Sequence, residues 1–249
     1  MTTPESINPY DNSRGKTEQV REMFDNIAPA YDRLNRAMSF GLDRSWRRKA
    51  VAMVTATAPG SIVDIATGTG DFAISLARAI PRASVTGLDL SEGMVAIGRR
   101  KVADAGLDSR VTLITGDCLA SPLPEGCADA VTVAFGVRNF ADLAAGYRAM
   151  YRMLRPGGML CVIELSTPVS PLVKPFYDIY ARGIIPLMGR VVSSDRRAYS
   201  YLPESIAAVP QGDDMLALMR GAGFTDASFL RLTLGVCTIY TAVRPTQST

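Results

Sequence analysis

Short apolar runs alternate with amphipathic segments between residues 61 and 165. Short apolar runs are typical of buried strands, and the segments between them place apolar residues at helical spacing. This alternation predicts a doubly wound, mostly parallel sheet of an α/β protein. The expected strands are 61–66, 84–88, 110–115, 128–135 and 160–165, and the expected helices are 71–79, 91–105 and 143–154.

The segments on either side of this alternation follow other patterns. Apolar residues at helical spacing predict helices over 17–28, 32–38 and 43–57, after which Pro59-Gly60 ends the all-helical part. Residues 166–211 contain six prolines and several aromatic residues, which we interpret as a helical insertion over the carboxyl edge of the sheet. A helix over 213–222 and an antiparallel pair, 224–232 and 236–243, would complete seven strands.

The length of 249 residues suits one domain of this kind. Residues 1–15 are polar, and we predict that they are a mobile segment. Residues 16–249 then form the domain, in which 16–58 make an N-terminal helical cap and 166–211 make a lid.

Composition excludes several classes of function. A net charge of +3 is too weak to indicate nucleic acid as the main partner. The chain has no histidine, and its four cysteines form no CxxC pair, so we exclude Ser-His-Asp triads and expect no metal site. With no visible signal peptide and no apolar run of about 18 residues, we expect a cytoplasmic protein with free thiols.

The most informative motif follows the first expected strand. It reads Val63-Asp64-Ile65-Ala66-Thr67-Gly68-Thr69-Gly70-Asp71 and leads directly into a helix. Glycines let the backbone approach a ligand closely, and the free N–H groups of a helix N-terminus bind anionic groups. Open α/β sheets bind ligands at this edge. The motif therefore predicts a cofactor site that includes Asp64, Gly68 and Gly70.

Two more carboxylates stand at the ends of expected strands. Asp89 ends the second strand, where a carboxylate can accept from both ribose hydroxyls of a nucleoside. Asp117 follows the third strand, where it could accept from an adenine amino group while the Cys118 backbone meets the ring. These positions indicate a cofactor with a nucleoside end.

The glycine turn alone does not separate two cofactors. Gly68-Thr-Gly70-Asp-Phe-Ala73 also satisfies the dinucleotide pattern G-x-G-x-x-A, which is typical of NAD sites. Asp64 favours S-adenosylmethionine because its carboxylate would accept from the amino group of that cofactor and would repel a pyrophosphate. Asp117 suits adenine, and the chain has no separate domain for a hydride acceptor. An NAD-dependent oxidoreductase and a non-catalytic cofactor-binding protein remain as alternatives.

Several dispersed motifs resemble one family, the quinone-biosynthesis C-methyltransferases that act on demethylmenaquinol and on a ubiquinone precursor. The resemblance covers roughly residues 18–243. It is carried by Tyr31-Asp32-Arg-Leu-Asn35-Arg-Ala-Met38-Ser39 with Trp46, by Asp64 to Asp71, by Phe135-Gly136-Val137-Arg138-Asn139, by Arg152 to Ser166, by Tyr199 to Tyr201 and by Leu202-Pro-Glu204-Ser205-Ile206.

The resemblance implies a class I methyltransferase that uses S-adenosylmethionine on a Rossmann-like, seven-stranded sheet. The implied reaction is C-methylation of demethylmenaquinol to menaquinol, the last step of menaquinone biosynthesis, with the polyprenyl-methoxy-benzoquinol precursor of ubiquinone as the alternative substrate. It also implies Thr69, Asp89, Asp117 and Cys118 as residues that line the cofactor site. Arg138 and Asn139 follow the fourth expected strand, so we expect them to face the reacting methyl group.

Three positions depart from the family pattern. Asp43 stands where the family usually has histidine, and Leu34 stands where it usually has methionine. Ala134 stands where some members have a serine that contacts the cofactor, so that contact is not carried over.

The expected chemistry needs no metal, because the sulfonium already activates the methyl group. Our hypothesis is that Arg138 stabilises negative charge on the ring oxygen, while Asn139 and Tyr31 orient the quinol or a water that takes the proton. The isoprenoid tail of the family's substrates would lie between the lid and the N-terminal helices. A lipid substrate also suggests transient membrane contact at a basic cluster, namely Arg44, Arg47, Arg48 and Lys49.

Overall fold

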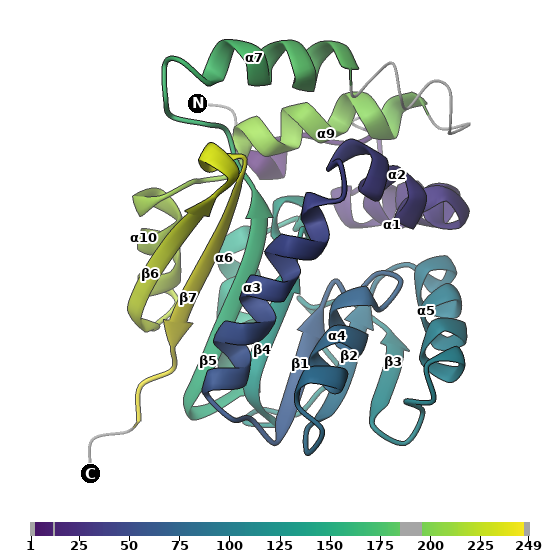
Figure 1. Cartoon of the computed structure of the whole chain (residues 1–249), viewed down its shortest axis with the longest axis vertical. Helices are drawn as coiled ribbons and strands as arrows, with labels where there is room; N and C mark the ends of the chain where they lie inside the picture. The colour runs from purple at the N-terminus through teal and green to yellow at the C-terminus, as the bar shows by residue number, and fades with distance from the viewer. Residues whose placement is uncertain (1–2, 12, 185–195, 247–249) are drawn as a thin grey trace.

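The computed structural model describes residues 3–11, 13–184 and 196–246. Its centre is a seven-stranded sheet with the order β3-β2-β1-β4-β5-β7-β6 (Figure 1). The first five strands are parallel, whereas β7 runs antiparallel to both β5 and β6. The strands are β1 (Ser61–Ile65), β2 (Ser84–Asp89), β3 (Val111–Thr115), β4 (Ala128–Ala134), β5 (Leu154–Leu165), β6 (Thr225–Leu232) and β7 (Cys237–Val243).

Helices cover both faces of this sheet, which confirms the doubly wound fold. Side chains alternate along β1, so that Ile62 packs with one helical layer and Val63 with the other. The first layer is α3 (Leu42–Ala56), α4 (Asp71–Ala79) and α5 (Glu92–Asp104); the second is α6 (Leu143–Met153) and α10 (Asp213–Gly221).

The N-terminal cap and the lid meet over the carboxyl edge of the parallel strands, at the top of Figure 1. A third apolar cluster joins them, in which Met23 and Leu34 of the cap contact Ala198 and Tyr201 of the lid. The insertion is helical as expected, and its residues 185–195 lie outside the described part. Of the predicted cap, α1 (Lys16–Ile27), η2 (Ala28–Ala30) and α2 (Tyr31–Met38) lie at this edge and keep the name cap, whereas α3 packs against the face of the sheet. The lid comprises α7 (Lys174–Ile179), η4 (Tyr180–Ile184) and α9 (Arg196–Ala208).

The described residues before α1 contact the rest of the domain. The turn η1 (Pro4–Ser6) accepts a hydrogen bond at its Pro4 carbonyl from the Lys16 ammonium, at 2.6 Å. The Gln19 amide oxygen accepts from the backbone N–H groups of Tyr10 and Asp11, at 3.0 and 3.1 Å. The mobility that we expected of residues 1–15 stays a prediction.

The start of β5 differs from our expectation. We expected a helix to residue 154 and a strand from residue 160, but β5 begins at Leu154, directly after α6. Leu154 pairs with Ala128 across a register shift in β4. The Arg155 guanidinium donates to Asp129 at 2.6 Å, which ties the segment to β4. Long-range pairing therefore extends the strand through residues whose local pattern is typical of a turn.

No helix within the described ranges is long and apolar enough to cross a bilayer.

Candidate active site

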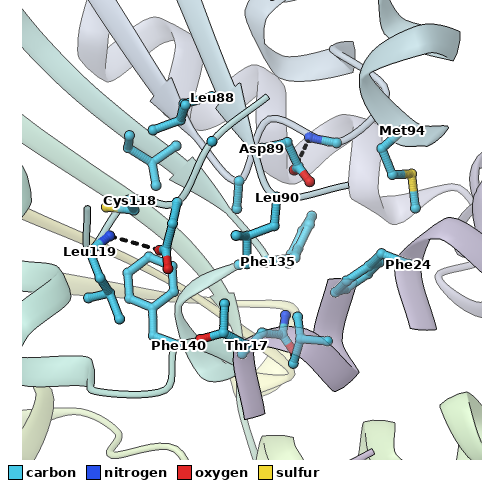
Figure 2. A pocket seen from close by; sticks show the side chains of 18 of the residues that line it. Thr17, Phe24, Leu88, Asp89, Leu90, Met94, Cys118, Leu119, Phe135 and Phe140 are labelled. Carbon is cyan, nitrogen blue, oxygen red and sulfur yellow. Dashed lines mark hydrogen bonds between the residues drawn. The ribbon is translucent and has the colours of Figure 1, made fainter. Parts of the chain in front are cut away.

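A cavity opens at the carboxyl ends of β1, β2, β3 and β4 and holds about 700 Å³ of empty space, including its mouth. Figure 2 shows Asp89 and Leu90 reaching into it from the end of β2, opposite Thr17 and Phe24 of α1. Of the residues that we predicted for the cofactor, it brings together Gly68, Asp89, Asp117 and Cys118. Carboxyl ends of parallel strands meet at one edge, and this geometry explains why motifs far apart in sequence converge here.

Asp89 is held in place by the backbone. Its Oδ2 accepts from the Gly68 N–H at 2.7 Å, and its Oδ1 accepts from the Ser91 N–H at 2.9 Å. Burial raises the pKa of this carboxyl to about 6, although the two backbone hydrogen bonds act in the opposite direction. Each carboxylate oxygen keeps a further lone pair at the cavity wall, so the group can still accept from the hydroxyls of a ribose.

The opposite end of the cavity suits a planar base. The Asp117 Oδ1 accepts from the Leu119 N–H at 2.9 Å, which turns the chain so that Cys118 and Leu119 line the wall. Burial raises the pKa of the Cys118 thiol to about 12, so the thiol stays neutral. A carboxylate, an apolar wall and backbone groups fit the nucleoside end of S-adenosylmethionine.

Asp64 lies behind the glycine turn rather than in the cavity wall. Both of its oxygens accept from threonine hydroxyls, at 2.6 Å from Thr67 and at 2.7 Å from Thr132 on the neighbouring strand β4. Burial raises its pKa to about 6. The direct contact with the cofactor's amino group that we predicted therefore has no support in this arrangement. The carboxylate instead holds the turn against β4.

The Thr69 side chain also points away from the cavity. Its hydroxyl donates to Asp32 of α2 at 2.6 Å and accepts from Lys101 of α5 at 3.1 Å. The Lys101 ammonium also contacts Asp71 at the start of α4. Gly70 is the N-cap of α4 with φ of +77°, and it too lies outside the cavity lining. Thr69 and Gly70 thus shape the turn and connect it to the cap.

Two residues in the cavity wall have an unusual backbone. Ala66 and Phe135 follow β1 and β4 with φ of +52° and +63°, a region that residues with a Cβ rarely adopt. Such strain is typical of functional sites, where the surrounding structure enforces it. Here it turns both chains sharply at the carboxyl edge and brings the Phe135 ring into the wall.

A second cavity, of about 650 Å³, lies between the cap and the lid. Tyr31 and Phe135 line both this cavity and the first one. The remaining wall is mostly aromatic and apolar, with Trp46 of α3 and Tyr177 and Tyr180 of the lid. This composition suits an apolar ligand that reaches toward the first cavity.

Arg138 lies in the turn η3 (Val137–Asn139) and forms a buried ion pair. Its Nη1 donates to Glu164 Oε1 at 2.6 Å and to the Phe135 carbonyl at 2.5 Å, and its backbone N–H donates to the same carboxylate at 3.2 Å. Burial opposes the charge, but the Glu164 carboxylate outweighs it and raises the pKa of Arg138. The guanidinium is therefore a fixed positive charge, and it lines the second cavity.

Asn139 and Tyr31 connect the cavities. Asn139 lines the first cavity and a third, smaller one of about 420 Å³, and Tyr31 lines all three. The three residues that we predicted for the reacting ring thus lie together.

Sequence patterns missed several wall residues. Phe24 falls in the helix expected over 17–28 without a predicted site role, but it lines the first and third cavities. Glu164 stands near the carboxyl end of β5, as Asp89 does in β2, and a carboxylate at the end of a strand was the signal that could have found it. Tyr201 of the lid belongs to a motif that carried the resemblance, but no pattern gave it a role. Among the described residues, no cluster of three or more Cys, Asp or Glu side chains is placed to hold a metal ion.

Comparison with known proteins agrees with this geometry. The model of the ubiE/COQ5 methyltransferase family matches residues 12–244. The chain belongs to this family. It is therefore a methyltransferase, and the alternative of an NAD-dependent oxidoreductase is set aside.

Relatives cover nearly the whole chain. A "Demethylmenaquinone methyltransferase" of Porphyromonas gingivalis is 48% identical, over 98% of this chain and 100% of its own. A "Ubiquinone/menaquinone biosynthesis C-methyltransferase UbiE" of Geobacter sulfurreducens is 44% identical, over 91% and 88%. A solved SAM-dependent methyltransferase of Thermotoga maritima has a TM-score of 0.61 at 18% identity, over 90% and 99%, and supports the fold alone. The seven-stranded methyltransferase fold and the use of S-adenosylmethionine agree with our predictions.

We expect Asp89 to control cofactor affinity. A charged acceptor contributes roughly 1.5–3 kcal/mol per hydrogen bond, so Asp89→Asn should weaken binding of S-adenosylhomocysteine at pH 7.5 by about 10- to 100-fold. Because the pKa of Asp89 is raised to about 6, wild-type affinity should fall as the pH drops through 6 and the carboxylate becomes neutral. Isothermal titration calorimetry between pH 5 and 8 measures both effects.

Asp64→Asn is the matched control. Asp64 has the same raised pKa but lies outside the cavity lining, so this variant should keep the pH dependence that Asp89→Asn loses. Equal affinity and equal pH dependence in Asp89→Asn and the wild type would contradict the assignment.

Proposed function

We propose that this methyltransferase transfers the methyl group of S-adenosylmethionine to a ring carbon of demethylmenaquinol, with release of one proton, to give menaquinol. The relative from Porphyromonas gingivalis carries the name of this activity and is 48% identical. The polyprenyl-methoxy-benzoquinol precursor of ubiquinone is the second candidate, because the relative from Geobacter sulfurreducens is named for both quinones.

The observation that carries the proposal is the meeting of two different cavities at Tyr31 and Phe135. One offers the acceptors of a nucleoside site, and the other offers an aromatic and apolar wall. A ring held between them can present one carbon to the first cavity while its isoprenoid tail occupies the second. Methyl transfer requires this alignment and the exclusion of water.

Residues at the junction supply what the reaction needs. The bound cofactor supplies an activated methyl group. A quinol oxygen pushes electron density into the ring more strongly when it loses its proton, and the fixed charge of Arg138 favours that ionised form. Burial raises the pKa of Tyr31, so this phenol stays neutral and can orient the ring oxygen. With no histidine in the chain, a water molecule oriented by Asn139 and Tyr31 takes the proton.

The substrate assignment is tested with purified enzyme and reduced quinones. We expect methylation of demethylmenaquinol with S-adenosylmethionine, measured by mass spectrometry of the extracted quinone, and slower methylation of the benzoquinol precursor. The oxidised quinone should not react, because it lacks the electron-donating hydroxyls. Preference for the benzoquinol would favour the second candidate, and inactivity on both would contradict the proposal.

Removal of the Arg138 charge should slow methyl transfer without loss of cofactor binding. Arg138→Gln alone would leave Glu164 buried and unpaired, which costs about 3–5 kcal/mol of stability, so the informative variant is Arg138→Gln with Glu164→Gln. Loss of one stabilising donor lowers kcat by roughly 10²–10³. We expect a loss of that size at nearly unchanged S-adenosylhomocysteine affinity.

The matched control removes a second ion pair, which joins β4 to β5. Nη1 of Arg155 lies 2.6 Å from Oδ1 of Asp129, and both side chains are partly exposed. The pair stands at the beginning of β5 and β4, away from the carboxyl ends that form the site. Arg155→Gln with Asp129→Asn should keep kcat close to wild type. A kcat close to wild type in the double variant of Arg138 and Glu164 would contradict the role that we propose for the Arg138 charge.

We also propose peripheral contact with a membrane, through the lid rather than through the basic cluster that the sequence suggested. Arg47 of that cluster is partly buried, pairs with Asp43 at 2.5 Å and lies 5.2 Å from the Phe135 ring centre. In contrast, α7 buries none of its six residues and also supplies Tyr177 to the second cavity. Large apolar side chains are exposed on and near α7, namely Phe40, Val169, Leu172, Phe176 and Ile179. They offer a tail-bearing quinol a route from lipid to the cavity.

Vesicle binding distinguishes the two surfaces. Burial of one large apolar side chain contributes about 1.5–3 kcal/mol, so Leu172→Asp with Phe176→Asp should weaken sedimentation with phosphatidylglycerol vesicles by at least about tenfold. Leu230→Asp, at an exposed leucine of β6, is the control and should bind like the wild type. Loss only after charge reversal at Arg44, Arg48 and Lys49 would favour the basic cluster instead.

A further inference from the structure

Three buried polar atoms around the third cavity have no hydrogen-bond partner within the ranges that the structure describes. They are Nε of Arg138, Oδ1 of Asn139 and Oη of Tyr201. The three residues are only 6%, 7% and 4% exposed, and all three line this cavity. A buried polar atom without a partner costs about 1–3 kcal/mol, so three around one space indicate a ligand that satisfies them.

The unpaired atoms match the bonding capacity of one hydroxyl group. Arg138 Nε is a donor, Asn139 Oδ1 is an acceptor, and the Tyr201 phenol can donate. A hydroxyl has one hydrogen to give and two lone pairs to accept with. Its O–H can donate to Asn139 while its oxygen accepts from Arg138 and Tyr201.

The surroundings select a phenolic hydroxyl on an aromatic ring. Apart from Asn35, the rest of the third cavity is apolar or aromatic, with Met23, Phe24, Ile27 and Leu34 from the cap. Tyr31 lines all three cavities and Arg138 lines the second and third, so a ring held between the first two cavities can direct a hydroxyl into the third. Burial raises the pKa of Tyr201 above its ordinary range, so the phenol keeps its proton and can donate.

We propose that Tyr201, Arg138 and Asn139 form a three-point site for one hydroxyl of the quinol, which makes Tyr201 of the lid a substrate-binding residue. When that hydroxyl loses its proton to a water molecule, Arg138 and Tyr201 both donate to the resulting oxygen anion. Because α9 contacts η3, the lid brings the third group of the site against the two that follow β4. This inference rests on the proposed function for the identity of the substrate, but not for the chemistry of the site.

The test uses 1-naphthol as a probe, a phenol whose ionised form has a distinct absorbance. With the enzyme saturated with S-adenosylhomocysteine, bound 1-naphthol should have an apparent pKa below that of the free compound. Tyr201→Phe removes one donor and should raise this pKa by about one unit, and kcat for demethylmenaquinol should fall at least about tenfold. The charged and titratable neighbours of Tyr201, namely Arg138 and Glu164, remain in both proteins.

Tyr147→Phe is the matched control. Tyr147 is another fully buried phenol, on α6, whose hydroxyl lies 3.0 Å from the sulfur of Met215 and outside all three cavities. This variant should leave the pKa of bound 1-naphthol and kcat close to wild type. It separates loss of a donor at the site from loss of a buried hydroxyl in general.

Each outcome decides. Failure of 1-naphthol to bind, or an unshifted pKa in the wild type, would overturn the site without any variant, and a site that holds only water gives this result. If bound 1-naphthol has the same pKa in Tyr201→Phe and in the wild type, Tyr201 is not part of the hydroxyl site. If demethylmenaquinol is not methylated but the pKa of 1-naphthol depends on Tyr201, the proposed substrate fails and the phenol site stands.

Discussion

The buried ion pair between Arg138 and Glu164 is the interaction on which the site depends. It joins the turn after β4 to the end of β5, and the same carboxylate also accepts from the Arg138 backbone N–H. Glu164 is only 1% exposed, so the pair is shielded from water and either partner alone would be a costly buried charge. The pair fixes both the guanidinium and the backbone that carries Asn139. The pair therefore helps to hold the turn η3, which contributes Asn139 to the cofactor cavity and Arg138 to the apolar cavity.

Much of the fold follows from local patterns. The alternation of apolar runs and helices predicted a parallel sheet. Ser91, where one of the expected helices begins, caps α5 by accepting from the Met94 N–H at 3.0 Å. The start of β5 was not predictable in this way, because Leu154 joins the sheet by pairing with Ala128. A local window contains turn residues there but not the partner strand.

The site was predictable to the extent that strand ends mark it. Asp89 and Asp117 stand at such ends and line the cavity. Asp64 and Thr69 belong to the same motif, yet their side chains are satisfied by Thr67, Thr132, Asp32 and Lys101. A motif identifies the loop that lies at a ligand site. It does not tell which of the loop's polar side chains face the ligand and which hold the loop in its conformation. Tyr201 lies in a motif that carried the resemblance, but no local pattern placed it at the site, because its position in the third cavity depends on how α9 packs against η3.

The two halves of the site differ in how they are prepared. Around the cofactor cavity, Asp89 and Asp117 already accept from backbone N–H groups, so that wall is organised before any ligand arrives. Around the third cavity, Arg138, Asn139 and Tyr201 each keep an unpaired buried atom. The carboxylate oxygens of Asp89 and Asp117 keep further lone pairs for a ligand, whereas a ligand that satisfies the unpaired atoms around the third cavity recovers about 1–3 kcal/mol from each of them. The unsatisfied polar atoms therefore gather in the cavity where we propose that the quinol hydroxyl binds.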